Sequence, residues 1–199
     1  MLELIIGPMF AGKSTELLRR VRRHSISGKE CLYVKYAADT RYDTANIATH
    51  DLLTENARAV TLLSELGDDW KNFDVIGVDE GQFYNDVVEF CEMAAHAGKI
   101  VIVSALGATY QREGFNSILE LVPKAEKIKQ LHAICKLCFE PASFTLRTCQ
   151  DQNMELIGGA EAYMPVCREC FFVKTQEQEQ QRQHLQDKTS AVEVTYGAQ

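Results

Sequence analysis

Apolar and polar positions along the chain fall into blocks that predict strands followed by helices. An apolar run at 2–6 ends at Gly7, and in 15–27 the apolar residues recur at the spacing of one helical face. Three further apolar runs predict strands at 31–36, 74–78 and 100–105. The last two are nearly continuous in apolar residues, which predicts strands buried on both faces. Strands that alternate with helices predict a parallel sheet covered on both sides.

Polar residues mark the connections between these elements. Asp86 is expected to begin a helix, with Glu89 as its capping-box partner and Gly98 just past the helix end. The polar stretch 37–58 lacks any periodicity and predicts a long functional loop.

The second half of the chain changes character. From Ile128 the pattern becomes short strand-like pieces around paired cysteines, and 176–186 contains six glutamines with almost no apolar residues. We therefore expect an α/β domain at 1–127, a metal-binding lobe at 128–175 and a disordered polar tail at 176–199.

Composition limits the classes of protein that fit. The 199 residues are 46% hydrophobic and 25% charged, as in an ordinary globular protein, and no apolar run reaches the roughly 18 residues of a membrane span. The net charge of -7 argues against nucleic acid as a partner. We expect a soluble, cytoplasmic protein with reduced thiols and no membrane contact.

A glycine-rich loop carries the strongest chemical signal. It has the spacing Gly-x4-Gly-Lys-Ser and lies between the first strand and the first helix, as Gly7, Pro8, Met9, Phe10, Ala11, Gly12, Lys13 and Ser14. In such loops backbone N–H groups hold phosphates, Lys13 would reach the β- and γ-phosphates, and Ser14 would bind Mg²⁺. The expected fold is α/β, with a P-loop NTPase-type (RecA-like) parallel sheet flanked by helices and a small zinc-ribbon-like lobe.

Two carboxylates follow the strand at 74–78. Asp79 and Glu80 should stand at the carboxyl edge of the sheet, on the side of the glycine loop. We assign Asp79 to Mg²⁺ and Glu80 to the general base, with Lys13 as the second catalytic residue.

Four cysteines have the spacing of a metal site. Cys135-x-x-Cys138 and Cys167-x-x-Cys170 predict two knuckles that present thiolates to one structural Zn²⁺. The remaining three cysteines, Cys31, Cys91 and Cys149, lack this spacing, and we expect them to be packed as small hydrophobic residues.

Four arginines cluster in the predicted first helix, at 19, 20, 22 and 23. We expect them to form a solvated helix face or to donate inter-subunit salt bridges, and we assign them no chemistry.

Several segments, in order, resemble one family. They are 7–17, 35–42, 79–83, 111–112, the four cysteines and 157–163, and together they resemble the thymidine kinases that carry a zinc lobe. The resemblance implies transfer of the ATP γ-phosphate to the 5′-hydroxyl of thymidine or deoxyuridine, which gives dTMP in pyrimidine salvage for DNA precursor synthesis. It also implies a homotetramer inhibited by dTTP, with Glu80 as the base.

The resemblance also implies site residues. On the donor side it adds Asp39, Arg41 and Gln82 to the glycine loop and Asp79. The nucleoside pocket would comprise Met9, Phe83, Leu106, Tyr110, Phe115, Thr145 and Tyr163. A closing (lasso) loop of Met154, Glu155, Leu156, Ile157 and Gly158 would hold the base through main-chain groups.

The chain departs from the family pattern at two places. Gly107-Ala108 stands where the family usually has Asp-Gly, and Tyr110 often corresponds to phenylalanine. Two other functions fit the glycine loop: a P-loop ATPase whose zinc lobe grips nucleic acid, and a nucleotide-sensing module that transfers no phosphate.

Overall fold

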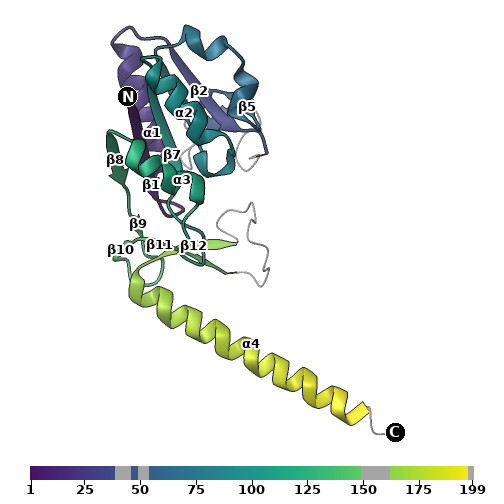
Figure 1. Ribbon diagram of the computed structural model, residues 1–199. Helices are drawn as coiled ribbons and strands as arrows, with labels where there is room; N and C mark the ends of the chain where they lie inside the picture. Colours follow the sequence, from purple (N-terminus) through teal and green to yellow (C-terminus); the bar gives the residue numbers. More distant parts are fainter. Residues whose placement is uncertain (39–45, 49–53, 149–161, 197–199) are drawn as a thin grey trace.

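A six-stranded parallel sheet forms the centre of the molecule. The computed structural model describes residues 1–38, 46–48, 54–148 and 162–196. The strand order is β5-β2-β6-β7-β1-β8, and every pair is parallel (Figure 1). The strands are β1 (Leu2–Gly7), β2 (Cys31–Tyr36), β5 (Arg58–Val60), β6 (Val75–Val78), β7 (Ile100–Leu106) and β8 (Lys127–Gln130). The predicted α/β class is confirmed.

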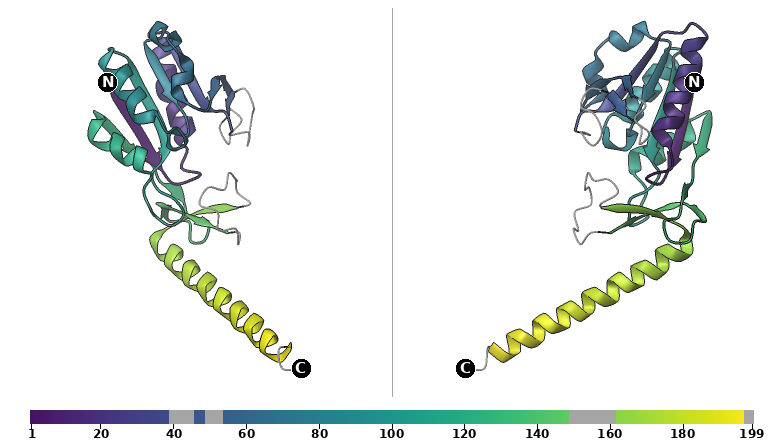
Figure 2. Two further views of the ribbon diagram at one scale, coloured as in Figure 1. Left: turned by 45° about the vertical axis from the view of Figure 1, so that its right-hand side comes forward. Right: turned by 180° about the vertical axis from the view of Figure 1, so that it is seen from behind.

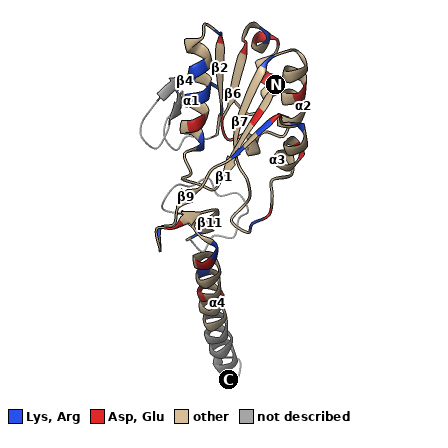
Figure 3. Cartoon of the chain, turned by 90° about the vertical axis from the view of Figure 1, so that its left-hand side faces the viewer, with Lys and Arg blue, Asp and Glu red and all other residues tan. Residues whose placement is uncertain are grey.

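Helices cover both faces of the sheet, as Figure 3 shows. On one face lies α1 (Lys13–Ile26), and on the other lie α2 (Val87–His96) and α3 (Asn116–Leu121). In the described part of the chain, four short 3₁₀ helices lie in the connections, η1 (Leu63–Leu66), η2 (Asp69–Asn72), η3 (Gly81–Phe83) and η4 (Val122–Lys124). The sheet therefore buries two apolar layers, one beneath α1 and one beneath α2 and α3.

The α1 layer depends on a close approach between helix and sheet. Val21 of α1 is fully buried, and a Cβ placed on Gly77 of β6 would lie 2.8 Å from its Cγ2 atom. Burying a valine side chain contributes roughly 1.5–3 kcal/mol. Glycine at 77 thus lets α1 lie directly on β6 and fixes where the glycine loop before α1 must stand.

Asp86 does not use the capping box that the sequence predicts. It is the N-cap of α2, but its side chain makes no capping hydrogen bond there. Its carboxylate instead accepts hydrogen bonds from the N–H groups of Leu63 (3.0 Å) and Ser64 (2.8 Å) at the start of η1. The capping expectation was wrong because a nearby helix start offers two free donors to the same carboxylate.

The expected boundary at 127/128 falls at the start of a sheet strand. β8 pairs with β1 from Lys127 to Gln130, so the α/β body runs to Gln130. The lobe beyond it contains β9 (Ala133–Ile134), β10 (Pro141–Ala142), β11 (Phe144–Arg147) and β12 (Tyr163–Val166), paired as two antiparallel hairpins. The stretch expected as a loop at 37–58 includes a small antiparallel pair, β3 (Asn46–Ala48) and β4 (Thr54–Asn56).

The C-terminal segment is helical. α4 (Arg168–Tyr196) continues through the glutamine-rich region and extends away from the body (Figure 2), which differs from the expected disordered tail. Glutamine, glutamate and lysine are good helix formers, so a polar composition alone does not prevent a helix from forming. Among the described residues, no helix is both long and apolar enough to cross a membrane.

Candidate active site

The glycine loop connects β1 to α1 through two left-handed backbone positions. Gly12 has φ of +76°, which glycine adopts without strain, and Phe10 has φ of +64°. The chain turns so sharply that the Nζ atom of Lys13, nearly buried, donates to the carbonyl of Pro8 at 2.9 Å. The Lys13 ammonium is therefore held over the loop that precedes it.

Ser14 and Asp79 meet across the carboxyl ends of the sheet strands. The Ser14 hydroxyl, in the first turn of α1, donates to Oδ1 of Asp79 at 3.1 Å. Ser104 of β7 donates to the same oxygen. Asp79 follows β6, and its own N–H donates to the carbonyl of Val34 in β2 at 2.9 Å. The glycine loop and the acidic pair thus border one space.

The Asp79 carboxyl is buried beside a second acid. Burial, and next the negative charge of Glu80, raise the pKa of Asp79 to about 6. The hydrogen bonds from Ser104 and Ser14 and the charge of Lys13 act in the opposite direction. A buried carboxylate and a hydroxyl that share a site are the oxygen ligands that Mg²⁺ takes in phosphoryl-transfer sites.

Glu80 stands on a strained turn after Asp79. Its φ of +54° is uncommon for a residue with a side chain and costs about 1–3 kcal/mol unless its surroundings enforce it. Nε2 of Gln82 donates to Oε2 of Glu80 at 2.7 Å, and the N–H of Leu106 donates to Oε1 of Gln82 at 2.9 Å. The amide of Gln82 thus fixes the Glu80 carboxylate relative to the end of β7.

The lobe touches the glycine loop directly. The N–H of Met9 donates to the hydroxyl of Thr145 in β11 at 3.0 Å, and Ala11 packs against the apolar centre of the lobe. Arg112, from the segment between β7 and α3, places its guanidinium 5.0 Å from the Phe171 ring centroid and 4.8 Å from that of Phe172. These contacts dock the lobe on the side of the body where the strands end.

Four of the residues predicted for the nucleoside pocket make contacts at this junction: Met9, Tyr110, Thr145 and Tyr163. Phe83 stacks on Tyr36 at 5.2 Å between ring centroids, and Tyr110 and Tyr163 both contact Arg147. Phe115 packs instead against the apolar layer beneath α2 and α3. The predicted residues Asp39 and Arg41 and the segment 154–158 lie outside the described residues.

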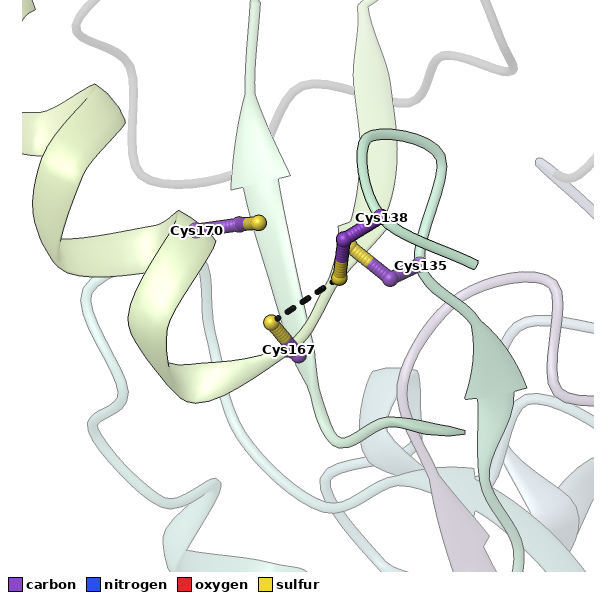
Figure 4. A group of neighbouring side chains, drawn as sticks. All are labelled: Cys135, Cys138, Cys167 and Cys170. Atoms are coloured by element: carbon purple, nitrogen blue, oxygen red, sulfur yellow. Dashed lines mark hydrogen bonds between the residues drawn. The ribbon is translucent and has the colours of Figure 1, made fainter. Parts of the chain in front are cut away.

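The four predicted cysteines form one cluster. Figure 4 shows Cys135, Cys138, Cys167 and Cys170 pointing toward one another, and their sulfur atoms all lie within 4.8 Å of one another. Burial raises the pKa of Cys135, but the backbone N–H groups of Cys167, Cys138 and Leu137 outweigh it and lower the pKa to about 6. Neighbouring sulfurs, Cys167 first, raise the pKa of Cys170. Four thiolates so close together require a cation, so this cluster can bind a metal ion.

Sequence reasoning missed two residues that contact predicted site residues. Ser104 is a polar residue inside an otherwise apolar strand, and this interruption could have indicated a polar partner such as Asp79. Arg147, 4% exposed between two tyrosines, gave no such signal, because its neighbours come from distant parts of the chain.

Comparison with known proteins identifies the family of the chain. The family described as thymidine kinase matches residues 1–171. The cytosolic thymidine kinase of Gallus gallus is 50% identical over 177 residues, which cover 89% of this chain and 79% of the relative. The cytosolic thymidine kinase of Homo sapiens is 50% identical over 173 residues (87% and 74%), and the thymidine kinase of Sheeppox virus is 48% identical over 173 residues (87% and 97%).

Proposed function

Because the chain belongs to the thymidine kinase family, we propose that it transfers the γ-phosphate of ATP to the 5′-hydroxyl of thymidine to give dTMP. Deoxyuridine is the second acceptor. The observation that carries the proposal is the hydrogen bond from Ser14 to Asp79, because it joins the phosphate loop to the acidic pair at one edge of the sheet.

On the donor side, the loop from Gly7 to Ser14 holds the triphosphate of ATP. Its N–H groups and the Lys13 ammonium stabilise the negative charge that builds up on the β- and γ-phosphates. Ser14 and Asp79 would hold Mg²⁺, which neutralises phosphate charge when bound. Asp39, Arg41 and Gln82 complete the donor site in this proposal.

On the acceptor side, Glu80 removes the proton from the 5′-hydroxyl. The hydroxyl oxygen forms a bond to the γ-phosphorus, the bond from that phosphorus to the β-phosphate oxygen breaks, and ADP leaves. Support comes from the hydrogen bond of Gln82, which holds the carboxylate in one orientation. The segment 154–158 would close over the base and the sugar. Both would lie among the seven residues expected for the nucleoside pocket: Met9, Phe83, Leu106, Tyr110, Phe115, Thr145 and Tyr163.

We propose that the cysteine cluster binds Zn²⁺. Tetrahedral ligation with zinc–sulfur bonds of about 2.3 Å places sulfurs about 3.8 Å apart. The sulfurs of Cys138 and Cys167 lie 3.5 Å apart and all four within 4.8 Å, so the cluster fits the ion. Four thiolates leave no position for a substrate, and the zinc is therefore structural.

Three further properties come with the family proposal. They are inhibition by dTTP, assembly as a homotetramer, and a cytoplasmic location, for which the relatives named as cytosolic give support. Inhibition kinetics with dTTP and analytical ultracentrifugation test the first two.

A coupled assay of the purified protein with ATP and a panel of deoxynucleosides tests the function. We expect ADP release to depend on thymidine or deoxyuridine. ATP hydrolysis that responds to DNA and not to nucleosides would instead favour the P-loop ATPase, and ATP binding without turnover would favour a nucleotide sensor. Metal analysis of the same sample should give about one zinc per chain.

A further inference from the structure

Arg147 is a buried cation with no role in the chemistry described above. It ends β11 and is 4% exposed. The Cζ atom of its guanidinium lies 3.9 Å from the ring centroid of Tyr110 and 5.2 Å from that of Tyr163. Its Nη2 atom also donates to the hydroxyl of Tyr163 at 2.6 Å.

These contacts join two parts of the molecule. Tyr110 belongs to the body, in the segment between β7 and α3, whereas Tyr163 begins β12 in the lobe. Burying a guanidinium is costly unless its surroundings stabilise the charge, and the faces of aromatic rings do so most strongly where water is excluded. Both tyrosines therefore interact favourably with the same planar guanidinium.

The backbone around Arg147 holds this arrangement in place. Arg147 and Tyr163 are directly paired in the β11–β12 ladder, and the N–H of Thr148 donates to the carbonyl of Ala162 at 2.8 Å on the next pair. In addition, Nε2 of Gln178 in α4 donates to the carbonyl of Arg147 at 3.0 Å. The guanidinium thus projects from a fixed strand toward Tyr110.

We propose that Arg147 is a positioning residue for the nucleoside, because it sets the spacing between Tyr110 of the body and Tyr163 of the lobe. The inference rests on the proposed thymidine kinase function, in which both tyrosines line the nucleoside pocket. A flat base needs walls at a fixed separation, and the planar guanidinium supplies it by stacking on one ring and hydrogen bonding to the other. Lysine carries the same charge, but its ammonium group is not planar and cannot stack on one ring while it donates a hydrogen bond to the other.

The test uses Arg147→Lys, with Arg23→Lys on the exposed face of α1 as the matched control. KM for thymidine, KM for ATP and kcat are measured, together with zinc content and the thermal unfolding midpoint. In Arg147→Lys we expect the KM for thymidine to rise about tenfold or more while the KM for ATP stays within about twofold. Arg23→Lys should match the parent protein in all of these.

A purely structural role gives a different result. It would lower the unfolding midpoint and the active fraction, and a smaller active fraction reduces kcat without changing KM. Tyr163→Phe keeps the ring and removes only the hydroxyl, so it should raise the KM for thymidine by a smaller factor than Arg147→Lys. If the parent protein phosphorylates thymidine and Arg147→Lys has an unchanged KM for thymidine, the inference is overturned. A parent protein inactive on thymidine overturns the proposed function itself.

Discussion

At the scale of single residues, Glu80 combines a strained backbone with a hydrogen-bonded carboxylate. Its left-handed φ and the hydrogen bond from Gln82 are the features expected of a side chain held in place for proton transfer. Replacing the carboxylate by an amide of the same shape should leave ATP binding nearly intact and lower turnover by roughly 10²-fold or more. Turnover of Glu80→Gln and its affinity for a fluorescent ATP analogue measure the two effects.

The matched control for this variant is Glu89→Gln, which changes an exposed carboxylate on α2. It should keep both properties. Full turnover in Glu80→Gln would remove Glu80 from the role of base.

Tyr84 presents a second residue-scale question. Its side chain is fully buried, with its ring edge-on to Tyr36 at 5.5 Å, and its hydroxyl has no hydrogen-bond partner among the described residues. A buried donor without a partner loses the hydrogen bonds that water gave it in the unfolded chain. Tyr84→Phe should therefore raise the free energy of unfolding by about 1 kcal/mol, measured by urea denaturation. A clear loss of stability would show that the hydroxyl has a stabilising partner, such as a buried water.

At the scale of elements, Glu3 links three of them. From β1 it accepts hydrogen bonds from Arg20 of α1 (2.7 Å) and Lys127 of β8 (2.9 Å). Burial opposes ionisation of Glu3, but the interactions with Lys127 and Arg20 outweigh it and lower its pKa from the ordinary 4.5. Because the folded-state pKa is depressed, this stabilisation is present above pH 4.5 and is lost as the pH falls through the folded-state value.

Glu3→Gln should accordingly destabilise the protein by about 1 kcal/mol at pH 7. The difference from the parent protein should shrink as the pH falls below about 4.5. Urea denaturation at both ends of this range measures it, and a difference that does not change with pH would contradict the assignment to ionised Glu3.

Elements also show where sequence reasoning succeeds and fails. The β1–loop–α1 unit and the strands at 31–36, 75–78 and 100–106 were predictable because local periodicity and glycine spacing specify them. The partner of Asp86 was not, because η1 lies 22 residues or more away in sequence. The helix in the tail was not predicted, because low hydrophobicity and high helix propensity occur together in its glutamines.

At the scale of the whole molecule, what the sequence could not supply is how the lobe docks. Cysteine spacing predicted the cysteine cluster, yet nothing local indicates that Thr145 receives a hydrogen bond from Met9 or that Arg147 lies against Tyr110. Such contacts depend on the packing of segments that are far apart in the sequence, and they place Thr145 of the lobe against Met9 of the glycine loop.

This docking predicts how loss of the metal should act. Within its described residues the lobe has a small apolar centre, built around Leu146, Val166 and Phe171, whereas the body has two extensive apolar layers. With the proposed zinc bound to its cysteines, a lobe of this size would depend on the metal to fold. Removing zinc with a chelator should therefore unfold the lobe, release Thr145 from Met9 and abolish thymidine turnover, while the sheet of the body stays folded.

Hydrogen exchange separates these two responses, because amides of the lobe should lose protection and amides of β1, β6 and β7 should keep it. Cys167→Ser should reproduce the effect of the chelator, whereas Cys31→Ser, a thiol outside the cluster, should retain zinc and turnover. If Cys167→Ser keeps both its zinc and its turnover, the cluster does not hold the lobe together. If the body loses protection along with the lobe, then the two parts fold as one unit, and the metal supports the phosphate loop as well as the nucleoside pocket.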